Sequence, residues 1–543
     1  MLESEASTRA APESAPWWKG AAIYQVYPRS FADSNGDGVG DLAGVTAHLD
    51  YIASLGVDGV WLSPFFPSPM KDFGYDVADY LGVDPLFGTL ADFDALLARA
   101  HALGLKLVID QVYAHTSDQH PWFIDSAASR ENSKADWYVW ADARDDGSPP
   151  NNWQASFGGP SWTWSPTRRQ YYFHNFLVEQ PDLNFWSEEV QETMLGVGRF
   201  WFDRGVDGLR LDVINYIVHD RVLTDNPIEP RARPPGLPTL FQRHVHDRSR
   251  PEALAFVRRL RRLADERPGR MLVGEVVDEP PLPRQREYTR GPDRLHTAYG
   301  FHLLTARRST PALFTEALSG WADGEGWPSW SLGNHDVARY ATRLARSGDP
   351  REVRILLAAL LCLRGTIFLY QGEELGLPQA NLPLAALRDP FDIATAGEGA
   401  GRDGARTPMP WTAEGPSAGF SAVAETWLPV DPAHRPLAVA EQETDAGSML
   451  HFTRRLIALR RRLPALRLGE VTIDETAPAN LLAFTRRCGG EAVLCLFELG
   501  GRETLAPAPA GSAIEATFGF DGESESVALR LPPFGGAVLR LAE

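Results

Sequence analysis

The stretch Val206-Asp207-Gly208-Leu209-Arg210-Leu211-Asp212 decides how this chain folds. It has the pattern of a short apolar strand that ends on an acid, and Met271-Leu272-Val273-Gly274-Glu275 repeats that pattern. A third acid, Asp336, ends the polar cluster Asn334-His335-Asp336. Acids at the carboxyl ends of parallel strands face one rim of a barrel, where barrel enzymes build their active sites. The pattern therefore predicts a parallel α/β barrel with acidic side chains gathered at one rim.

Outward from these stretches, strand patterns alternate with helix patterns along most of the chain. Strand patterns at residues 22–26, 57–62 and 105–110 are separated by helix patterns at residues 45–55 and 90–103. The later members of the series are a helix at 187–204, the strand that ends at Asp212, a helix at 252–264, the strand that ends at Glu275, strands at 328–332 and 366–370, and a closing helix at 450–462. Such alternation produces parallel βαβ units. Eight of them fit within this span, although the sixth strand is poorly marked.

Two parts of the chain depart from this alternation. Residues 114–181 contain few periodic helices and many aromatic, Asn, Gly and Pro residues, and a stretch of this length after a barrel strand is too long for a simple loop. After residue 468 the helix patterns stop, and short strand patterns follow. We therefore expect a disordered lead at residues 1–16, a (β/α)8 TIM barrel at residues 17–115 and 182–467, an inserted domain at residues 116–181, and a C-terminal antiparallel, sandwich-like β domain at residues 468–543.

The composition is that of an acidic globular protein. The 543 residues carry a formal net charge of -18, and 44% of them are hydrophobic. A nucleic-acid surface needs clustered positive charge, so no nucleic-acid partner is expected and a small neutral substrate fits better. The three cysteines do not form a disulfide framework. The N-terminus lacks the pattern of a secretion signal, and no apolar run reaches the roughly 18 residues of a membrane span. We expect a cytoplasmic protein, and the sequence does not indicate its oligomeric state.

Two carboxylates that face each other are what cleavage of a glycosidic bond requires, because one donates a proton while the other attacks or supports water. Arg210 lies two residues before Asp212 on the same strand face, and its fixed positive charge would keep Asp212 ionised. Glu275 follows an apolar strand, where partial burial would raise its pKa and keep it protonated. A single acid at a strand end is more simply explained as a cap or a member of an ion pair than as a catalytic group. The hypothesis therefore depends on the three acids, Arg210 and two histidines taken together.

These motifs resemble the α-amylase family of glycoside hydrolases and, within it, the oligo-1,6-glucosidase and α-glucosidase group. The matching segments run from residue 17 to the C-terminus and are Asp110-Gln111-Val112-Tyr113-Ala114-His115, Gln180-Pro181-Asp182-Leu183-Asn184, Gly208-Leu209-Arg210-Leu211-Asp212, Gly274-Glu275-Val276 and Asn334-His335-Asp336. One such segment alone would be weak support for the resemblance. The whole set, in this order and with plausible spacing, is specific for the family. The resemblance implies that Asp212 is the nucleophile, Glu275 the general acid/base and Asp336 the transition-state stabiliser.

The resemblance also implies a set of sugar-binding residues. His115 and His335 would donate hydrogen bonds to hydroxyls beside the scissile bond. In Gly74-Tyr75-Asp76, Tyr75 would stack on the sugar, while Asp76 would hydrogen-bond its far hydroxyls and pair with Arg402 rather than Arg406. An Asp–Arg pair that closes the pocket admits one terminal sugar, which predicts exo action. A structural salt bridge is the alternative.

The loop Asp33-Ser34-Asn35-Gly36-Asp37-Gly38-Val39-Gly40-Asp41 is rich in oxygen ligands at alternate positions, as calcium loops are. It also resembles the ion loop of the glucosidase group. We expect a structural Ca²⁺ or Mg²⁺ held by Asp33, Asn35, Asp37, Asp41 and the Val39 carbonyl. An empty Gly/Asp turn is the alternative. Neither a catalytic metal nor an organic cofactor is expected, because the acids already fill the catalytic roles.

The sequence leaves the substrate open. Phe157 and Phe176 lie in segments that border the inner sugar sites in the group, although core positions in the inserted domain are equally consistent. Val213, next to the nucleophile, is associated in the group with α-1,6 linkages, whereas the loops after Asp212 and Glu275 differ from those of isomaltose-cleaving members. Residues 227–250, rich in Pro and Arg, are interpreted as a mobile loop over the rim or as a surface excursion without function.

The predicted function is that of an exo-acting retaining α-glucosidase, which releases α-glucose from the non-reducing end of short α-glucosides of the maltose or isomaltose type, with some transglucosylation. A glucosyltransferase or isomerase of the sucrose or trehalose type is the first alternative, because it would use the same covalent intermediate. An inactive family member that binds a sugar or a partner is the second. The intact Asp212, Glu275 and Asp336 argue against it.

Overall fold

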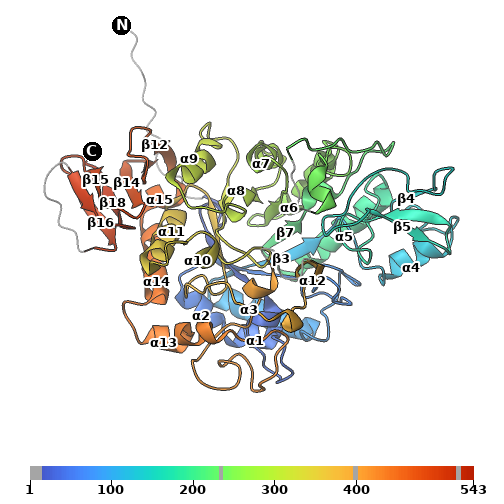
Figure 1. Cartoon of the computed structure of the whole chain (residues 1–543), viewed down its shortest axis with the longest axis horizontal. Helices are drawn as coiled ribbons and strands as arrows, with labels where there is room; N and C mark the ends of the chain where they lie inside the picture. Colours follow the sequence, from blue (N-terminus) through green and yellow to red (C-terminus); the bar gives the residue numbers. More distant parts are fainter. Residues whose placement is uncertain (1–14, 232–236, 395–400, 521–527, 543) are drawn as a thin grey trace, which may run out of the picture.

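The computed structural model describes residues 15–231, 237–394, 401–520 and 528–542, and most of the predicted lead lies outside them. Its centre is a barrel of eight parallel strands (Figure 1). The strands are β1 (Ala22–Val26), β2 (Gly59–Leu62), β3 (Lys106–Val112), β7 (Gly208–Asp212), β8 (Met271–Glu275), β9 (Thr297–Tyr299), β10 (Ser329–Trp330) and β11 (Thr366–Tyr370). They lie in the order β10-β11-β1-β2-β3-β7-β8-β9, and a parallel bridge between Ala298 and Pro328 closes the ring. The predicted fold class, a TIM barrel with an insertion and a C-terminal β domain, is confirmed.

The barrel strands are buried on both faces, as parallel strands require. In β1, Ile23 belongs to the apolar cluster that fills the barrel, while its neighbours Ala22 and Tyr24 belong to the larger cluster against the helices. The filling cluster consists of Ala21, Ile23, Trp61, Val108, Met271, Val273, Tyr299, Leu304 and Phe368. The barrel interior is therefore a packed core, and the polar side chains that could act on a substrate lie at its rim.

Helices surround the strands. They are α1 (Leu42–Ala47), α2 (Leu49–Ser54), α3 (Leu90–Ala102), α5 (Glu188–Arg204), α6 (Ala253–Asp265), α7 (Pro281–Thr289), α8 (Phe301–Leu304), α9 (Pro311–Ser319), α10 (Tyr340–Arg343), α11 (Pro350–Cys362), α12 (Pro390–Ala394), α13 (Val439–Glu443), α14 (Met449–Arg462) and α15 (Pro464–Leu468). Short 3-10 turns are η1 (Pro28–Ser30), η2 (Ile214–Tyr216), η3 (Pro238–Phe241), η4 (Leu384–Ala386), η5 (Asp403–Ala405) and η6 (Pro432–Leu437).

The helix ends follow local sequence signals. Thr89 and Asp92 form a reciprocal capping box at the start of α3, and α5 ends at Gly205, which has a φ of 112°. The single helix predicted at residues 45–55 is wrong, because α1 and α2 meet at His48, whose backbone is not helical. The His48 ring contacts Gly44 O at 2.8 Å and packs on Trp411 at 3.9 Å between ring centroids. Tertiary packing of His48 therefore accompanies the break in the helix.

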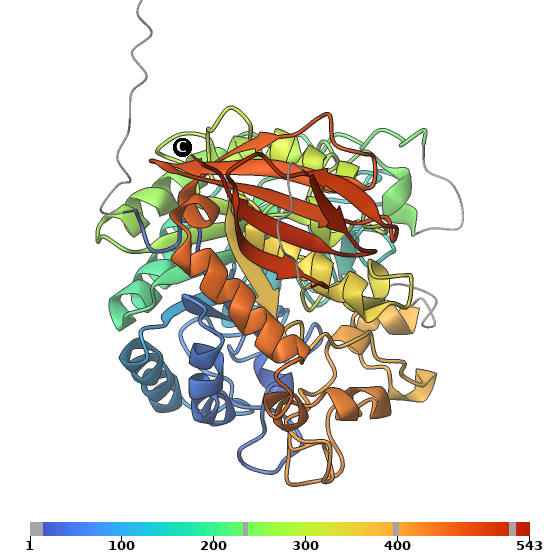
Figure 2. The ribbon, with the colours of Figure 1, turned by 90° about the vertical axis from the view of Figure 1, so that its left-hand side faces the viewer.

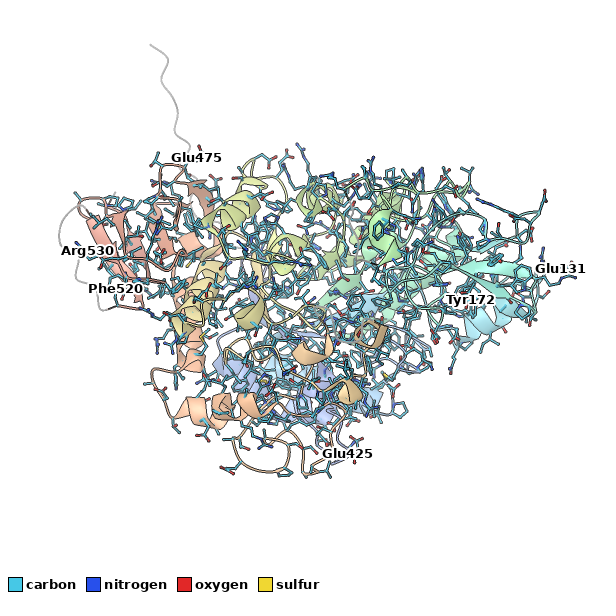
Figure 3. All side chains as sticks on the ribbon, viewed as in Figure 1. Glu131, Tyr172, Glu425, Glu475, Phe520 and Arg530 are labelled. Atoms are coloured by element: carbon cyan, nitrogen blue, oxygen red, sulfur yellow. The ribbon has the colours of Figure 1, made fainter. Side chains whose placement is uncertain are left out.

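The insertion after β3 contains α4 (Pro121–Ala128) and a small sheet of β4 (Trp140–Ala141), β6 (Gln170–Phe173) and β5 (Trp162–Ser165), in that order. Its own apolar cluster is built from Val139, Trp153, Trp162 and Phe173. The sheet projects from one side of the barrel, away from the C-terminal strands (Figure 1). Labelled Glu131 and Tyr172 mark this end of the molecule in Figure 3, and Phe520 and Arg530 mark the opposite end.

The C-terminal part is antiparallel. Strands β12 (Glu470–Ile473), β13 (Leu481–Cys488), β14 (Glu491–Glu498), β18 (Gly536–Arg540) and β16 (Ala513–Phe518) form one sheet, and β15 (Thr504–Pro507) pairs with β17 (Ala528–Leu531). Leu481, Leu496, Leu529 and Leu531 belong to one apolar cluster that joins the two sheets. Figure 2 shows the larger sheet in face view, with α14 beside it. In the part of the chain that the structure describes, no helix is both long enough and apolar enough to span a bilayer.

Candidate active site

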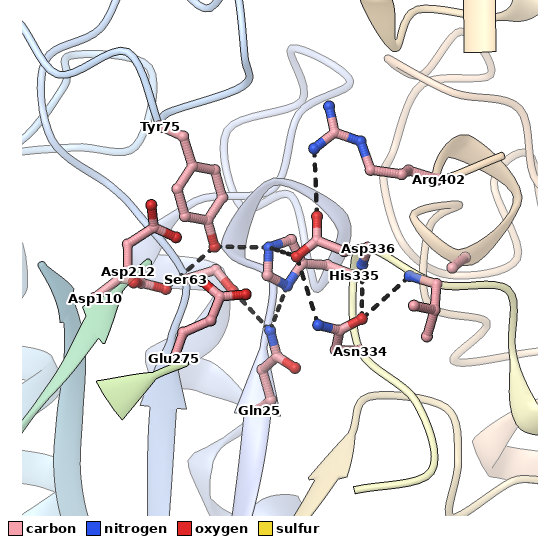
Figure 4. A network of polar contacts seen from close by, with 12 residues as sticks. Gln25, Ser63, Tyr75, Asp110, Asp212, Glu275, Asn334, His335, Asp336 and Arg402 are labelled. Atoms are coloured by element: carbon pink, nitrogen blue, oxygen red, sulfur yellow. Dashed lines mark hydrogen bonds and ion pairs between the residues drawn. The ribbon is translucent and has the colours of Figure 1, made fainter. Parts of the chain in front are cut away.

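The predicted acids gather at one rim of the barrel because of strand register. Leu211 in β7 is paired with Gly274 in β8, so the next residue of each strand, Asp212 and Glu275, occupies the same level of the rim. On the other side of β7, Asp212 is paired with Val112 of β3. Figure 4 shows Asp212, Glu275 and Asp336 around one polar site, together with Tyr75 and His335.

Arg210 lies at the centre of this site and is fully buried. Its Nη1 donates to Asp110 Oδ1 and to Asp212 Oδ1, both at 2.7 Å, and its Nη2 lies 2.6 Å from Glu275 Oε2. One guanidinium thus fixes three carboxyl groups from β3, β7 and β8. The prediction that Arg210 lies beside Asp212 is confirmed, whereas Asp110 was not predicted as a site residue.

The carboxyl groups of Asp212 and Glu275 contact the same guanidinium. Burial and the adjacent Glu275 carboxylate raise the pKa of Asp212 well above its usual range, against the effect of Arg210. A hydrogen bond between the two side chains acts in the same direction. The prediction that Arg210 keeps Asp212 ionised is therefore not borne out, because burial and the neighbouring Glu275 outweigh the effect of the guanidinium on this pKa.

Val213 connects the two acids through its backbone. Its N–H donates to Glu275 Oε2 at 3.1 Å, and its side chain is 6% exposed. Its φ of 30° and ψ of 47° place a β-branched residue in the left-handed region, which is strained. The surrounding structure therefore holds this residue in the conformation that directs its N–H to Glu275.

His335 is built into a polar network. Its Nδ1 lies 2.8 Å from Gln25 Nε2, while its Nε2 lies 2.6 Å from the Tyr75 hydroxyl and 3.0 Å from Asp336 Oδ2. The Tyr75 ring stacks parallel to the imidazole at 5.3 Å, and its hydroxyl donates to Asp110 Oδ2 at 3.2 Å. Burial lowers the pKa of His335 to about 3, so the ring is neutral, and its Nε2 faces the Tyr75 hydroxyl and Asp336 rather than open space.

Asp336 is the most exposed of the three acids, with 26% of its side chain accessible. Its Oδ1 accepts from Arg406 Nη2 at 2.9 Å and from Arg402 Nη1 at 3.3 Å. Burial would raise its pKa, but His335, Arg406 and Arg402 hold it well below its usual range. Asp336 is therefore an anion whose charge is available to a cationic transition state.

The predicted pairing of Asp76 with Arg402 is wrong. Arg402 Nη2 lies 2.8 Å from Asp72 Oδ1 instead. Asp76 is committed to the turn, because it accepts from Ser68 Oγ at 2.8 Å, from Lys71 N at 2.8 Å and from Asp72 N at 3.0 Å. Asp76 thus holds the turn from which Asp72 contacts Arg402.

Asp72 and Arg402 belong to a larger buried cluster that sequence reasoning missed. Asp389, fully buried, accepts from Arg402 Nε at 2.7 Å and from Arg406 Nη1 at 3.1 Å. Gln180 donates from Nε2 to Asp72 Oδ2 at 3.1 Å. Gln180 could have been found from the sequence, because it lies in the quoted segment Gln180-Pro181-Asp182-Leu183-Asn184. No sequence motif pointed to Asp389.

His115 and the two predicted phenylalanines lie beside this cluster. His115 Nε2 is 3.1 Å from Tyr75 O and 3.1 Å from Gln180 Nε2, and burial lowers the pKa of His115 to about 4. Phe176 packs on His115 at 5.3 Å and on Phe157 at 5.6 Å. The Arg402 guanidinium stacks on Phe157 at 4.9 Å. Both phenylalanines are only partly buried, and the structure brings them to the site.

The predicted ion loop is held by internal hydrogen bonds. Asp33 accepts from the N–H groups of Asn35, Gly36 and Gly38, and Asp41 caps α1 through Gly44 N at 2.6 Å. Among the described residues, no three His, Cys, Asp or Glu side chains converge as a metal site. The donor types suit Ca²⁺ or Mg²⁺, because oxygen ligands of this kind are what hard cations prefer. The ion therefore stays a prediction.

The described part of the loop predicted to be mobile is tied to the inserted domain. Within that loop, Gln242 Nε2 donates to Asn152 O at 2.6 Å. Just before it, Asn226 exchanges reciprocal hydrogen bonds with Asn152 at 2.9 and 2.8 Å. Trp153 Nε1 donates to Thr224 O at 2.8 Å. The stretch from Thr224 to Gln242 therefore contacts the inserted domain.

Comparison with known proteins gives this site a family. Residues 25–469 match the model of the alpha amylase catalytic domain. The whole chain is 48% identical to a probable alpha-glucosidase of Rhizobium meliloti (strain 1021), over 100% of both chains. It is 36% identical to an oligo-1,6-glucosidase of Heyndrickxia coagulans, over 89% of this chain and 92% of the relative.

Comparison with solved structures leads to the same family. The crystal structure of an alpha-glucosyl transfer enzyme, XgtA, superposes with a TM-score of 0.93 at 49% identity, covering 97% of this chain and 100% of that one. The trehalulose synthase MutB from Pseudomonas mesoacidophila MX-45 gives a TM-score of 0.89 at 30% identity, with the same coverage. The chain belongs to the α-amylase family, among its α-glucosidase and oligo-1,6-glucosidase members. It is therefore a glycoside hydrolase, as its sequence predicts.

Proposed function

We propose that this glycoside hydrolase is an exo-acting, retaining α-glucosidase that releases α-glucose from the non-reducing end of short α-glucosides. The observation that carries the proposal is the contact of one guanidinium, that of Arg210, with both Asp212 and Glu275. A retaining enzyme needs one carboxylate as nucleophile and one carboxylic acid as proton donor, at a separation of roughly 5–5.5 Å.

These roles require an ionised Asp212 and a protonated Glu275 when the substrate is bound. Asp212 would attack the anomeric carbon, while a proton passes from Glu275 to the leaving oxygen as the glycosidic bond breaks. In the second half, Glu275 would take a proton from the incoming water, whose oxygen displaces Asp212 from the glucosyl unit with a second inversion. Asp336 would stabilise the positive charge that develops on the sugar ring.

The exo action is supported by the polar end of the site. Asp72, Arg402 and Asp389 form a buried, hydrogen-bonded cluster there. Charged side chains that close one end of a pocket offer ligands to the hydroxyls of a terminal sugar and leave no path for a longer chain. Asp72 takes the place that sequence reasoning gave to Asp76.

Glucosyl transfer is the second candidate, and the 49% identity with XgtA over nearly the whole chain favours it. Transfer uses the same glucosyl-enzyme and replaces water with a hydroxyl of a second molecule. An isomerase of the sucrose type is the more distant variant, because the trehalulose synthase is 30% identical.

The test is incubation of the purified protein and its Asp212→Asn variant with maltose, isomaltose, sucrose and trehalose, followed by NMR of the products. Early release of α-glucose that is absent with the variant is the expected result. The preferred sugar then decides the linkage and the meaning of Val213. Longer or rearranged sugars as main products would make the protein a transferase or isomerase, and β-glucose as the first product would overturn retention.

We propose in addition that residues 33–41 hold a structural Ca²⁺ or Mg²⁺. Asp33, Asn35, Asp37 and Asp41 would supply side-chain oxygens, and Val39 its carbonyl. The ion would fix this loop against Ser421, whose Oγ donates to Asp33 Oδ2 at 2.6 Å.

A further inference from the structure

Gln25 is a polar side chain on the inner face of the barrel. It follows Ile23 by two residues on β1, so both side chains point to the same face of the strand, and Ile23 belongs to the apolar cluster that fills the barrel. Gln25 is fully buried and reaches His335 at the level of the active site (Figure 4). A buried amide at such a place calls for an explanation, because burial of a polar group is unfavourable unless its hydrogen bonds are replaced.

The amide of Gln25 acts through its nitrogen. Nε2 lies 3.1 Å from Ser63 Oγ and 2.8 Å from His335 Nδ1, which accounts for both of its hydrogens. Its Oε1 has no hydrogen-bond partner among the protein groups that the structure describes. The side-chain contacts of Gln25 are thus directed at one ring nitrogen of His335 and at the serine beside it.

The His335 ring is held in place, so its two nitrogens keep different partners. The rings of Tyr27 and Tyr75 lie nearly parallel to the imidazole, with ring centroids at 5.6 and 5.3 Å. Nδ1 faces Gln25, whereas Nε2 faces the Tyr75 hydroxyl and Asp336. The neutral ring carries one proton, and its position decides in which direction these hydrogen bonds run.

Asp336 decides which of the two nitrogens carries that proton. Its Oδ2 lies 3.0 Å from Nε2 of His335, and Asp336 is an anion that two arginines contact. A carboxylate oxygen accepts hydrogen bonds and does not donate them, so Nε2 has to be the protonated nitrogen. Nδ1 is then an acceptor, and Gln25 has to present an N–H to it rather than its carbonyl oxygen.

The direction of these hydrogen bonds matters for the charge of Asp336. A neutral His335 ring that is protonated at Nε2 donates to Asp336 and leaves the negative charge of the carboxylate in place. A ring protonated at both nitrogens would instead put a positive charge beside Asp336 and offset that charge. An acceptor in place of the Gln25 amide would favour this second state, because it would stabilise a proton on Nδ1.

We propose that Gln25 is a positioning residue that acts through His335. Its Nε2–H keeps Nδ1 of the ring free of a proton, so that Asp336 faces a neutral donor. The proposal rests on the proposed function in one respect, because the charge of Asp336 matters for turnover only if this acid stabilises a cationic transition state. The protonation state of the ring does not depend on that function.

The first measurement is ¹⁵N NMR of the protein labelled in its histidines, at neutral pH and without substrate. The chain has 13 histidines, and the signals of His335 are those lost in His335→Gln. The expected wild-type ring has a proton on Nε2 and none on Nδ1. A proton on Nδ1 would overturn the proposal.

Gln25→Glu keeps the shape of the side chain and replaces its N–H donor with an acceptor. The ring then lies between two carboxylates, and we expect it to be protonated at both nitrogens. Because this cation offsets the charge of Asp336 in the transition state, kcat for the preferred disaccharide should fall about a hundredfold, with little change of KM. A ring that still lacks a proton on Nδ1, or a doubly protonated ring with wild-type kcat, would overturn the proposal.

Gln25→Met removes the donor without adding a charge, and it keeps the test decisive if a buried carboxylate impairs folding. Asp336 alone then holds the proton on Nε2, while Nδ1 loses its hydrogen bond. We expect the Nδ1 resonance to shift and kcat to fall about threefold, less than in Gln25→Glu. A role in packing alone would give the opposite order, because methionine changes the shape more than glutamate does. That order, or an unshifted Nδ1 resonance, would overturn the proposal.

Gln285→Glu is the matched control. Gln285 is also a buried glutamine, and its Nε2 donates to the backbone oxygen of Tyr299 at 3.3 Å rather than to a histidine. The substitution adds a buried carboxylate elsewhere in the barrel, so the unfolding midpoint should fall while the His335 signals and kcat stay as in the wild type.

Failure of the proposed function is visible separately from failure of this proposal. It would appear in the wild type, as β-glucose as the first product or as no turnover of any of the sugars. The NMR signals of His335 are read without substrate, so they decide the role of Gln25 at the ring in either case.

Discussion

Asp72 and Arg402 form an ion pair of 2.8 Å between residues that are 330 positions apart in the chain. Asp72 lies in the segment after β2, and Arg402 lies just before η5. Arg402 also contacts Asp336 and Asp389, so one side chain connects the polar end of the pocket to the proposed transition-state stabiliser. These charged groups are thus joined by a contact that forms only when distant segments of the barrel come together.

Asp72→Asn should impair turnover because it removes one charged ligand while keeping the shape of the side chain. Loss of one partner of a buried charge pair typically costs about 2–5 kcal/mol. We therefore expect kcat/KM to fall at least about thirtyfold, measured by glucose release. Asp79→Asn, an exposed residue in the same segment, should behave as the wild type. Normal activity in Asp72→Asn together with a large loss in Asp76→Asn would return the sugar-binding role to Asp76.

Arg210→Lys should be severe although it conserves the charge. A compact ammonium cannot reproduce the planar contacts with Asp110, Asp212 and Glu275. We expect kcat to fall by about 10²–10³-fold and the thermal unfolding midpoint to drop, because buried carboxyls lose their partner. Arg204→Lys is the control, since its ion pair with Asp94 is exposed and should contribute little. A near-normal kcat in Arg210→Lys would show that a positive charge at this position is enough for catalysis, without the planar guanidinium.

The strand-end acids were predictable because each ends a short apolar run, and barrel topology brings such ends together. Asp72 was not predictable in the same way. It shares one turn with Asp76, and nothing in the local pattern tells which acid faces the pocket and which closes the turn. Only the contact with Arg402, which depends on closure of the barrel, separates them.

The weakly marked sixth strand illustrates the same limit. β9 is three residues long, so it is too short to show a periodic pattern, and its pairing with β8 defines it. Asp389 and Arg248 lie in irregular segments whose sequences give no sign of the buried charges they pair with. Local patterns therefore predict the strand-end acids, whereas side chains that position them are set by contacts between distant loops.

Removal of the proposed ion should destabilise the protein without abolishing activity directly. A ligand at a hundred times its Kd stabilises the folded state by about 2.7 kcal/mol. We expect a chelator to lower the thermal unfolding midpoint by a few degrees and excess Ca²⁺ or Mg²⁺ to restore it. Asp37→Ala, which removes the ligand oxygen, should abolish this response, whereas Asp146→Ala, at an exposed turn of the inserted domain, should retain it. A midpoint that responds to neither chelator nor added ion would exclude the site.

Glu373 offers a test of how burial couples stability to pH. It follows β11 and is 2% exposed, and burial raises its pKa to about 8, against the effect of the Tyr370 N–H, which donates to Oε2 at 3.0 Å. Its other oxygen faces Gly333, where an added Cβ would meet it, at the start of the loop that carries Asp336. In the unfolded chain the pKa of a glutamate is about 4.3.

Because the folded pKa lies above the unfolded value, the folded state binds the proton more tightly. Its contribution to stability is present below about pH 4.3 and is lost as pH rises towards 8, by at most about 1.4 kcal/mol per pH unit. Glu373→Gln removes the titration with little change of shape. We expect the wild-type unfolding midpoint to fall relative to that of the variant between pH 5 and pH 8. Parallel curves would mean that Glu373 is ionised throughout, so that its burial is compensated by a partner. Glu316→Gln, on α9 with a largely exposed side chain, should run parallel to the wild type and serves as the control.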